Sequence, residues 1–308
     1  MRIGIVTPAF NVAPFIGAAI GSVLRQTHTD WRMVVVDDGS TDRTAAVVRS
    51  FHDPRLSLIR QPNAGVSAAR NRGAAALTCD AILFLDGDDW LAPFALEVLA
   101  RGLVDDAVAV AVAGAWQKGA MVHPPASGDL LPRLLVRNQF VNGGHVLIRR
   151  SAAGLFRCDL RFGEDWEYWT RLPGRFAAAD DPRPVLVVRE RPGSAYLRMA
   201  TDPESFAPCL DAIHANPTVI ARFPAATRAL LRRRAEAEMH WVIGRELIRH
   251  RRTAEGLSWL RGSVIAAPSA RRVALLALAH GVPLLPGAWR GAMRPYALDG
   301  AALLPHSS

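Results

Sequence analysis

Three carboxylates stand within four residues in the stretch FLDGDDW, residues 84–90. They are Asp86, Asp88 and Asp89, and they directly follow the apolar run AILFL. Like charges this close repel, so at least one carboxyl group resists ionisation unless a positive charge lies among them. Two interpretations stay open. One is a polar turn in which Asp89 caps a helix that begins near Pro93. The other is a divalent cation held by oxygen ligands and completed by a ligand's phosphates.

A second acidic group, Glu164 and Asp165, stands in the stretch GEDWEYWTRL, residues 163–172. The apolar spacing around it predicts a helix over 162–172 that opens with these two carboxylates. Acidic side chains stabilise the first turn of a helix through its dipole, so a purely structural role stays open for the pair.

The elements that must position these groups can be predicted from the first 86 residues, where apolar runs of strand length alternate with helical periodicity. The order βαβαβαβ indicates a largely parallel sheet with helices on both faces. Ligands bind beyond the carboxyl ends of such strands, so the loops there should face one crevice. The strands are expected at RIGIVTP, WRMVVVDDG, RLSLIR and AILFLD, and the loops at 8–11, 37–40, 61–65 and 86–89.

Further along the chain, strands are expected at 107–113, 146–148 and 184–191, and only helices from Asp202 onward. The apolar stretch 273–289 is interrupted by glycine and prolines, and it is shorter than the roughly 20 residues of a membrane span. Because arginines flank it, it fits an interfacial segment on an anionic membrane. A buried C-terminal helix fits it as well.

The composition is that of a folded protein with a basic C-terminal third. The chain has 308 residues, half of them apolar, and a net charge of +9. Residues 221–294 contain 14 Arg against 4 Glu, a surplus that suits an anionic partner or a solvated helical surface. The three cysteines, Cys79, Cys158 and Cys209, fit neither a zinc cluster nor a disulfide framework, which favours a reducing cytosol. The N-terminus lacks the pattern of a signal peptide.

Several motifs in order resemble those of the family 2 glycosyltransferases, which have the GT-A fold. TPAFN resembles the family's first-strand motif, and VVVDDGSTDRT and NAGVSAARNRG resemble its second and third blocks. FLDGDDW resembles the Asp-x-Asp block, GEDWEYWTRL the acidic block with the catalytic base, and RERPGSAYLR the segment after the base. The resemblance covers about residues 1–200. It implies a GT-A catalytic domain there, with a nucleotide-sugar half at about 1–110 and an acceptor half at about 111–200. An Arg-rich helical region, 201–308, would follow.

The resemblance also implies roles for individual residues. Asp38 would bind the nucleobase, although an Asx turn at Asp38-Gly39-Ser40 stays an alternative. Phe10 stands where the family usually has Tyr, so its hydroxyl is missing, and a plain core position competes with a pocket role. Arg191 stands in a segment where the family often has His, and its guanidinium suits phosphate oxygens. The full set expected to bind the nucleotide-sugar is Pro8, Phe10, Asp38, Asn63, Arg70, Asp86, Gly87 and Arg191.

The same resemblance assigns the acidic groups. Asp88, with Asp86 and Asp89, would hold Mg²⁺ or Mn²⁺, hard cations that suit oxygen ligands. Asp165 would be the general base that takes the proton of the attacking acceptor hydroxyl. Glu164 would orient that base or touch the acceptor. Trp166 and Trp169 stand where they could stack on a sugar, with a core position as the alternative for Trp169.

The function expected is therefore an inverting, metal-dependent transfer from a nucleotide-diphosphate sugar, with UDP favoured. The acceptor would be a polysaccharide, lipid-linked or other cell-envelope hydroxyl. The expected location is cytoplasmic, with peripheral contact at the inner face of the membrane through residues 221–294. A sugar nucleotidyltransferase and a degenerate nucleotide-sugar-binding module are the alternatives. An NAD-dependent oxidoreductase is disfavoured because no G-x-G-x-x-G follows the first strand. No nucleic acid partner is expected, since no named binding motif is present.

Overall fold

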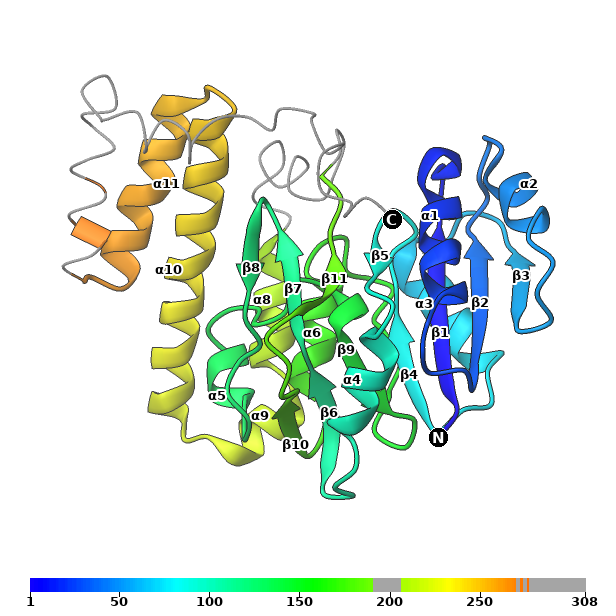
Figure 1. The fold of residues 1–308 in the computed structure, drawn as a ribbon. Helices are drawn as coiled ribbons and strands as arrows, with labels where there is room; N and C mark the ends of the chain where they lie inside the picture. Colours follow the sequence, from blue (N-terminus) through cyan, green and yellow to red (C-terminus); the bar gives the residue numbers. More distant parts are fainter. Residues whose placement is uncertain (191–205, 270–271, 274–275, 277–308) are drawn as a thin grey trace.

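The structure is a computed structural model that describes residues 1–190, 206–269, 272, 273 and 276. Its centre is a seven-stranded sheet in the order β10-β6-β9-β4-β1-β2-β3 (Figure 1). The strands of this sheet are β1 (Ile3–Ala9), β2 (Trp31–Asp37), β3 (Leu56–Arg60), β4 (Ala81–Phe84), β6 (Val108–Val112), β9 (Val146–Arg149) and β10 (Arg175–Ala178).

The N-terminal half of the sheet is parallel, as predicted. β1 lies between β2 and β4, with Ile3 opposite both Trp31 and Ala81. β3 extends the sheet in the same direction. All four strands therefore end at one edge, which brings the loops that follow them together.

Beyond β4 the sheet contains one strand that runs in the opposite direction. β9 pairs antiparallel with both β4 and β6, and β10 pairs parallel with β6. The sheet is thus mostly parallel with one inserted reversed strand. The expectations for 107–113 and 146–148 are confirmed by β6 and β9.

A smaller sheet packs beside the first, and only one of its strands was expected. Its order is β5-β11-β7-β8, and β11 confirms the late strand predicted at 184–191. The other three strands have two to four residues, too few to show an alternation. The bounds are β5 (Trp90–Leu91), β7 (Gly114–Gln117), β8 (Ala120–Val122) and β11 (Pro184–Val187).

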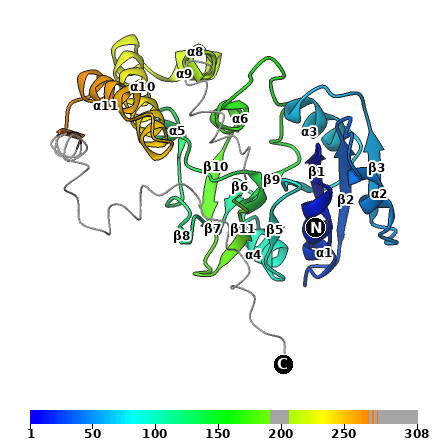
Figure 2. The same ribbon diagram turned by 90° about the horizontal axis from the view of Figure 1, so that it is seen from above.

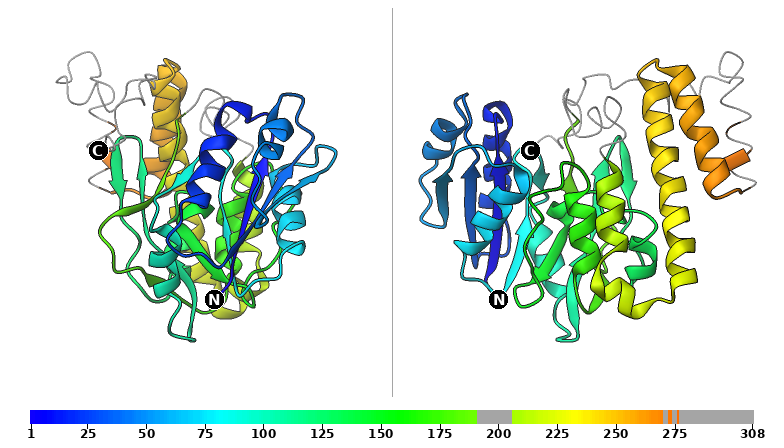
Figure 3. Two further views of the ribbon diagram at one scale, coloured as in Figure 1. Left: turned by 45° about the vertical axis from the view of Figure 1, so that its right-hand side comes forward. Right: turned by 180° about the vertical axis from the view of Figure 1, so that it is seen from behind.

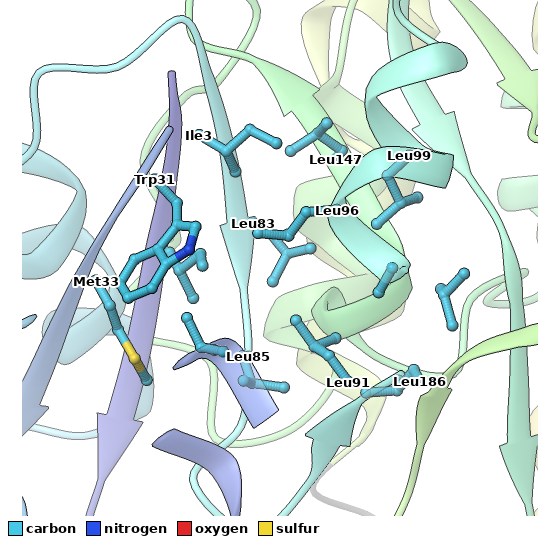
Figure 4. Packing of buried hydrophobic residues seen from close by; sticks show 14 of the residues in the cluster. Ile3, Trp31, Met33, Leu83, Leu85, Leu91, Leu96, Leu99, Leu147 and Leu186 are labelled. Atoms are coloured by element: carbon cyan, nitrogen blue, oxygen red, sulfur yellow. The ribbon is translucent and has the colours of Figure 1, made fainter. Parts of the chain in front are cut away.

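Helices cover both faces of the central sheet, as predicted. On one face, α1 (Ala13–Leu24), α2 (Thr44–Arg49) and α4 (Ala95–Arg101) form an apolar core with the sheet. Figure 4 shows Trp31 and Met33 of β2 beside Leu83 and Leu85, with Leu96 and Leu99 of α4 on the far side. On the other face, α3 (Val66–Ala75) and α6 (Glu164–Arg171) pack on a second core.

After residue 205 the described chain is helical, as predicted. It forms α8 (Ala207–His214), α9 (Pro217–Arg222), α10 (Ala225–Arg249) and α11 (Thr253–Ala266). α10 and α11 form a pair at the opposite end of the molecule from β3 and α2 (Figures 2 and 3). A third apolar core joins this region to α6 and to α5 (Leu131–Leu134). Within the described part of the chain, no helix is long and apolar enough to cross a membrane. Most of the stretch 273–289 lies outside the described residues.

Candidate active site

The loops after β1 and β2 are bound to each other at the carboxyl edge of the sheet. Asn11, at φ 52°, accepts from the backbone N–H of Thr41 through Oδ1 (2.9 Å). Its own N–H donates to Ser40 Oγ (3.0 Å). The neighbouring Phe10 is 48% exposed, so the core position considered for it is wrong. Pro8 lies in β1 opposite Val36, at the start of the same loop. The loop therefore presents an aromatic side chain above the sheet edge.

Asp38 binds the loop that follows β3. Its Oδ1 accepts from Gln61 Nε2 (2.7 Å) and from the Ala64 N–H (2.9 Å), and its Oδ2 accepts from the Gly65 N–H (2.8 Å). Asp38 is 4% exposed, whereas Asn63 in the bound loop is exposed. The structure thus places Asp38 as the residue that shapes this loop.

The turn contact considered for Asp38 is made by its neighbour Asp37 instead. Its Oδ1 accepts from the Ser40 N–H (2.9 Å), and its Oδ2 accepts from Arg60 Nε (2.8 Å). The two neighbouring carboxylates therefore have different partners and separate positions at the end of β2.

Arg70 connects the two acidic groups. It projects from α3, is 6% exposed, and donates from Nη2 to Asp86 Oδ1 (3.0 Å) and from Nη1 to Glu164 Oε1 (3.1 Å). Burial alone would lower its pKa, but Asp86, Glu164 and Asp165 raise the pKa of Arg70 above its ordinary value. Its guanidinium also lies over the ring of Phe156, 5.1 Å from the centroid. One buried cation thus joins the turn after β4 to the start of α6.

Asp89 is the most buried of the three carboxylates in the turn. It is 3% exposed, and its oxygens accept from Asn142 Nδ2 (2.6 Å) and from the Arg189 N–H (2.8 Å). Burial, with Asp86 and Asp88, raises its pKa well above the usual value. The helix-cap role considered for Asp89 is wrong, because α4 begins at Ala95 without any side-chain cap.

Asp165 lies at the first turn of α6 beside Glu164. Its Oδ1 accepts from the Trp166 N–H (2.7 Å), and its Oδ2 accepts from Asn138 Nδ2 (3.2 Å). Burial and the neighbouring Glu164 raise the pKa of Asp165 to about 7, against the opposing effect of Arg70. A carboxyl group with such a pKa can both accept and release a proton near neutral pH.

This arrangement can be compared with known proteins. Residues 4–161, just over half of the 308, match the model of the family described as glycosyl transferase family 2. The chain belongs to glycosyl transferase family 2. The predicted resemblance is thereby confirmed, and the two acidic groups joined by Arg70 belong to a family 2 protein.

One relative of this family 2 protein is WfgD of Escherichia coli, named UDP-Glc:alpha-D-GlcNAc-diphosphoundecaprenol beta-1,3-glucosyltransferase. It is 39% identical over 92 residues, which cover 29% of this chain and 36% of WfgD. The matches to three further curated relatives cover 16%, 26% and 31% of those proteins. The chain thus spans less than two thirds of each of these relatives.

Two solved structures share the fold. TarS 1-349 of Staphylococcus aureus has a TM-score of 0.64 at 18% identity, covering 91% of this chain and 87% of that one. The mannosyltransferase PcManGT of Pyrobaculum calidifontis, in complex with GDP-Man and Mn²⁺, has a TM-score of 0.61 at 20% identity, with 95% and 83% covered. The predicted GT-A-type α/β fold is thereby confirmed for this family 2 protein.

The turn of residues 86–89, named the Asp turn from here on, suits a divalent cation by the chemistry of its oxygen donors. The described residues contain no group of three His, Cys, Asp or Glu side chains that could hold a metal. Mg²⁺ needs no such group, because one or two carboxylates with phosphate oxygens and water suffice. Asp86 and Asp88 supply those oxygens, and the described contacts give the turn an ion pair, between Asp86 and Arg70. Gly87 packs against Pro8 and α1, where a Cβ would lie 3.3 Å from the Pro8 carbonyl oxygen.

The tryptophans of α6 are core residues. Trp169 is 1% exposed, which confirms the alternative considered for it. Trp166 is 8% exposed and donates from Nε1 to the Leu134 carbonyl (2.6 Å), so the stacking role expected for it is wrong. Arg191 lies outside the described residues. The nearby Arg189 donates from Nε to the Asp88 carbonyl (3.1 Å).

Two residues at the site were missed from the sequence. Asn138 contacts Asp165, and Asn142 contacts Asp89. Both lie in the connection between α5 and β9, where an isolated asparagine has no periodicity or motif to mark it. The two glycines that follow, Gly143 and Gly144, were the only local signal of close packing.

Proposed function

We propose that this protein is an inverting, metal-dependent glycosyltransferase. It would move a sugar from a nucleotide-diphosphate donor to a hydroxyl group of a cell-envelope polysaccharide or lipid-linked acceptor. The observation that carries the proposal is Arg70, which joins Asp86 of the Asp turn to Glu164 beside Asp165. A cation site and a proton acceptor thus lie on either side of one buried charge.

The donor would bind at the carboxyl edge of β1, β2 and β4. Phe10 offers an exposed aromatic face for the nucleobase, and Asp38 holds the loop that contains Asn63. UDP is favoured because TarS, which shares the fold, has been crystallised with UDP and with UDP-GlcNAc. WfgD is named for a UDP-glucose donor and a lipid-diphosphate acceptor, which supports the expected acceptor class.

The residues of the Asp turn would hold the cation with the donor's diphosphate. Asp88 and Asp86 are the ligands, and the Mn²⁺ complex of PcManGT supports this use of a divalent metal. When bound, the cation stabilises negative charge on the departing diphosphate. Asp89 keeps the turn in place through Asn142 and the Arg189 backbone.

Asp165 would accept the proton of the acceptor hydroxyl as its oxygen attacks the anomeric carbon. The pKa of about 7 leaves a large fraction of Asp165 ionised at neutral pH, yet basic enough to take the proton. Glu164 contributes to that raised pKa and is itself bound by Arg70. Attack from the face opposite the leaving diphosphate would invert the configuration of the sugar.

The test is thermal stabilisation of the protein by UDP, GDP, dTDP and CDP, each with and without Mn²⁺. A ligand at about a hundredfold over its dissociation constant stabilises the folded state by about 2.7 kcal/mol. Stabilisation by one nucleotide that depends on the metal is the expected result, and it names the base of the donor. The same thermal stability with all four nucleotides, whether Mn²⁺ is present or absent, would contradict the proposal.

A further inference from the structure

One short connection contacts both carboxylate groups of the site. Asn138 donates from Nδ2 to Asp165 Oδ2 (3.2 Å), and four residues later Asn142 donates from Nδ2 to Asp89 Oδ2 (2.6 Å). The proposed base and the Asp turn are therefore held by two side chains of the same segment, 138–142.

The orientation of each amide is fixed by its own backbone. Asn138 Oδ1 accepts from the Phe140 N–H (3.1 Å), and Asn142 Oδ1 accepts from the Gly144 N–H (2.9 Å). A backbone N–H can only donate, so the amide oxygen must face it and the NH₂ group must face the carboxylate. Both side chains thus act as donors to their acidic partners.

The segment is anchored to the core between its two ends. The Val141 N–H donates to His145 Nε2 (3.0 Å), and His145 Nδ1 lies 2.7 Å from the Ala113 carbonyl. Burial lowers the pKa of His145 to about 4, so the ring stays neutral at neutral pH, with Nδ1 as donor and Nε2 as acceptor. Phe140 is 5% exposed and packs edge-to-face on Trp169 of α6, at a centroid distance of 5.4 Å.

Gly143, the residue that follows the segment, fits closely against the strand that leads to the Asp turn. A Cβ on Gly143 would lie 2.6 Å from the Phe84 carbonyl oxygen at the end of β4, so only glycine fits there. The segment and Gly143 together thus contact β4, α6 and the core. They can fix the distance between Asp165 on α6 and the Asp turn after β4.

We propose that the segment 138–142 is a positioning clamp. Through Asn138 it orients Asp165, and through Asn142 it orients Asp89 and with it the Asp turn. An uncharged donor is suited to this task, because it directs a carboxylate without neutralising it. The negative charge of Asp165 then stays available for proton acceptance, while Asp89 holds the turn whose Asp86 and Asp88 would meet the cation. This proposal rests on the proposed function, in which those two ends have different tasks.

The test separates the two ends with near-isosteric variants, Asn138→Leu and Asn142→Leu. Asn216→Leu is the control, because Asn216 is a buried asparagine whose side chain caps α9 by accepting from the Thr218 N–H (2.8 Å). The measurements are UDP affinity in Mg²⁺ by calorimetry and the rate of UDP release from a UDP-sugar. Substitution of a residue that orients ligands or bases typically lowers affinity or activity about 10- to 100-fold.

N138L is expected to lower kcat by about that factor while the UDP–Mg²⁺ affinity stays near that of the unaltered protein. N142L is expected to weaken the UDP–Mg²⁺ affinity by about that factor. N216L is expected to lower thermal stability alone. If N138L and N142L behave like N216L, the clamp is overturned.

A second measurement needs no reaction. The side-chain amide signals of Asn138 in ¹H–¹⁵N spectra, assigned by their loss in N138L, are expected to shift with pH as Asp165 ionises, with a midpoint near 7. The charged and titratable groups that face Asp165 are Glu164 on α6, Arg70 on α3, Asp86 after β4 and Cys209 on α8.

Asp165→Asn is the control that must abolish this shift. A pH-independent Asn138 signal would overturn the clamp whether or not the protein releases UDP. If the shift is present but the unaltered protein neither binds nor releases UDP, the proposed function fails and the contact that defines the clamp stands.

Discussion

At the scale of single residues, the site depends on where positive charge lies among its carboxylates. Arg70 is the buried cation that meets both acidic groups, and it reaches Asp86 and Glu164 with different nitrogens. A planar guanidinium can span two partners in this way, whereas an ammonium is a single point charge. Removal of this residue would leave Asp86, Glu164 and Asp165 near one another in a partly buried space without its positive charge.

Arg70→Met is therefore expected to destabilise the fold by about 3–5 kcal/mol at pH 8, the usual cost of breaking a buried ion pair. The loss should shrink at pH 5, where protonation relieves the repulsion between the carboxylates. The destabilisation by Arg70→Lys should be smaller than that by Arg70→Met, because lysine keeps the charge but loses the forked guanidinium. Urea unfolding at both pH values measures this. Arg157→Met removes an exposed pair with Asp159 and should cost no more than about 1 kcal/mol.

The raised pKa of Asp165 predicts that activity and stability change in opposite directions as pH rises. The rate of transfer should rise with pH through about 7, because the base must be ionised. The folded protein binds more protons than the unfolded chain between the ordinary pKa of 3.8 and about 7, so the free energy of unfolding falls as pH rises across that window.

Asp165→Asn should consequently abolish transfer, keep UDP binding, and unfold at higher urea than the unaltered protein at pH 8. The gain should be at least about 1 kcal/mol, the equivalent of one unit of pKa, and it should vanish near pH 4. A variant that lost UDP affinity as much as rate, or that was less stable at pH 8, would contradict the role of base.

Residue roles were predictable from sequence where several acidic or turn-forming residues stood together. Asp86 and Glu164 could be singled out because each stands in such a cluster, although the contact of both with Arg70 could not. The burial of Trp166 and the exposure of Phe10 depend on the packing of distant elements, so no local pattern indicated them. Asn138 and Asn142 contact acidic partners that are remote in the chain, and the sequence around them has no periodicity that would reveal it.

At the scale of elements, the start of α6 decides where the proposed base lies. The helix begins after Gly163, which has φ 72° and whose carbonyl accepts from Cys209 Sγ (3.1 Å) on α8. A Cβ on Gly163 would lie 2.4 Å from that sulfur. Both the backbone conformation and the space therefore require glycine.

Gly163→Ala should cost more than backbone strain alone, because α8 must move away from α6. Gly119→Ala is the matched control. Gly119 has φ 71° with nothing within 4 Å of a Cβ, so its cost should be about 1–2 kcal/mol from conformation only. Urea unfolding compares the two, and UDP release should fall only for G163A. Equal destabilisation by both variants would mean that α8 does not hold the helix start.

The parallel strands of the fold were predictable because each is an apolar run closed by turn residues, as in β1, β2 and β4. The reversed direction of β9 and three strands of the small sheet, β5, β7 and β8, were not. A strand of two to four residues, such as β5 or β8, is stabilised by its neighbours and has no alternation of its own. The direction of β9 depends on pairing with strands that precede it by many residues.

At the scale of the whole molecule, the C-terminal helices are part of the same packed structure as the site. Trp166 of α6 shares an apolar core with Cys209 of α8 and Leu231 of α10. Along the N-terminal half of α10, the exposed Leu230 stands beside the exposed Arg233 and Arg234. The described part of the basic region thus presents cations next to an apolar side chain on α10. This helix shares one apolar core with α6, which carries the proposed base.

We expect this surface to contact an anionic membrane. An arginine near such a surface contributes about 1 kcal/mol to binding, so Arg233→Gln with Arg234→Gln should weaken affinity for phosphatidylserine vesicles by roughly 30-fold. The matched control is Arg43→Gln with Arg49→Gln, which removes two exposed charges at α2, at the far end of the molecule. Sedimentation with vesicles at low and high salt measures both, since the attraction is screened by salt.

Equal weakening by the two pairs would show that only net charge matters. No binding to the vesicles by the unaltered protein would remove the membrane from the account and leave the basic helices as a solvated surface.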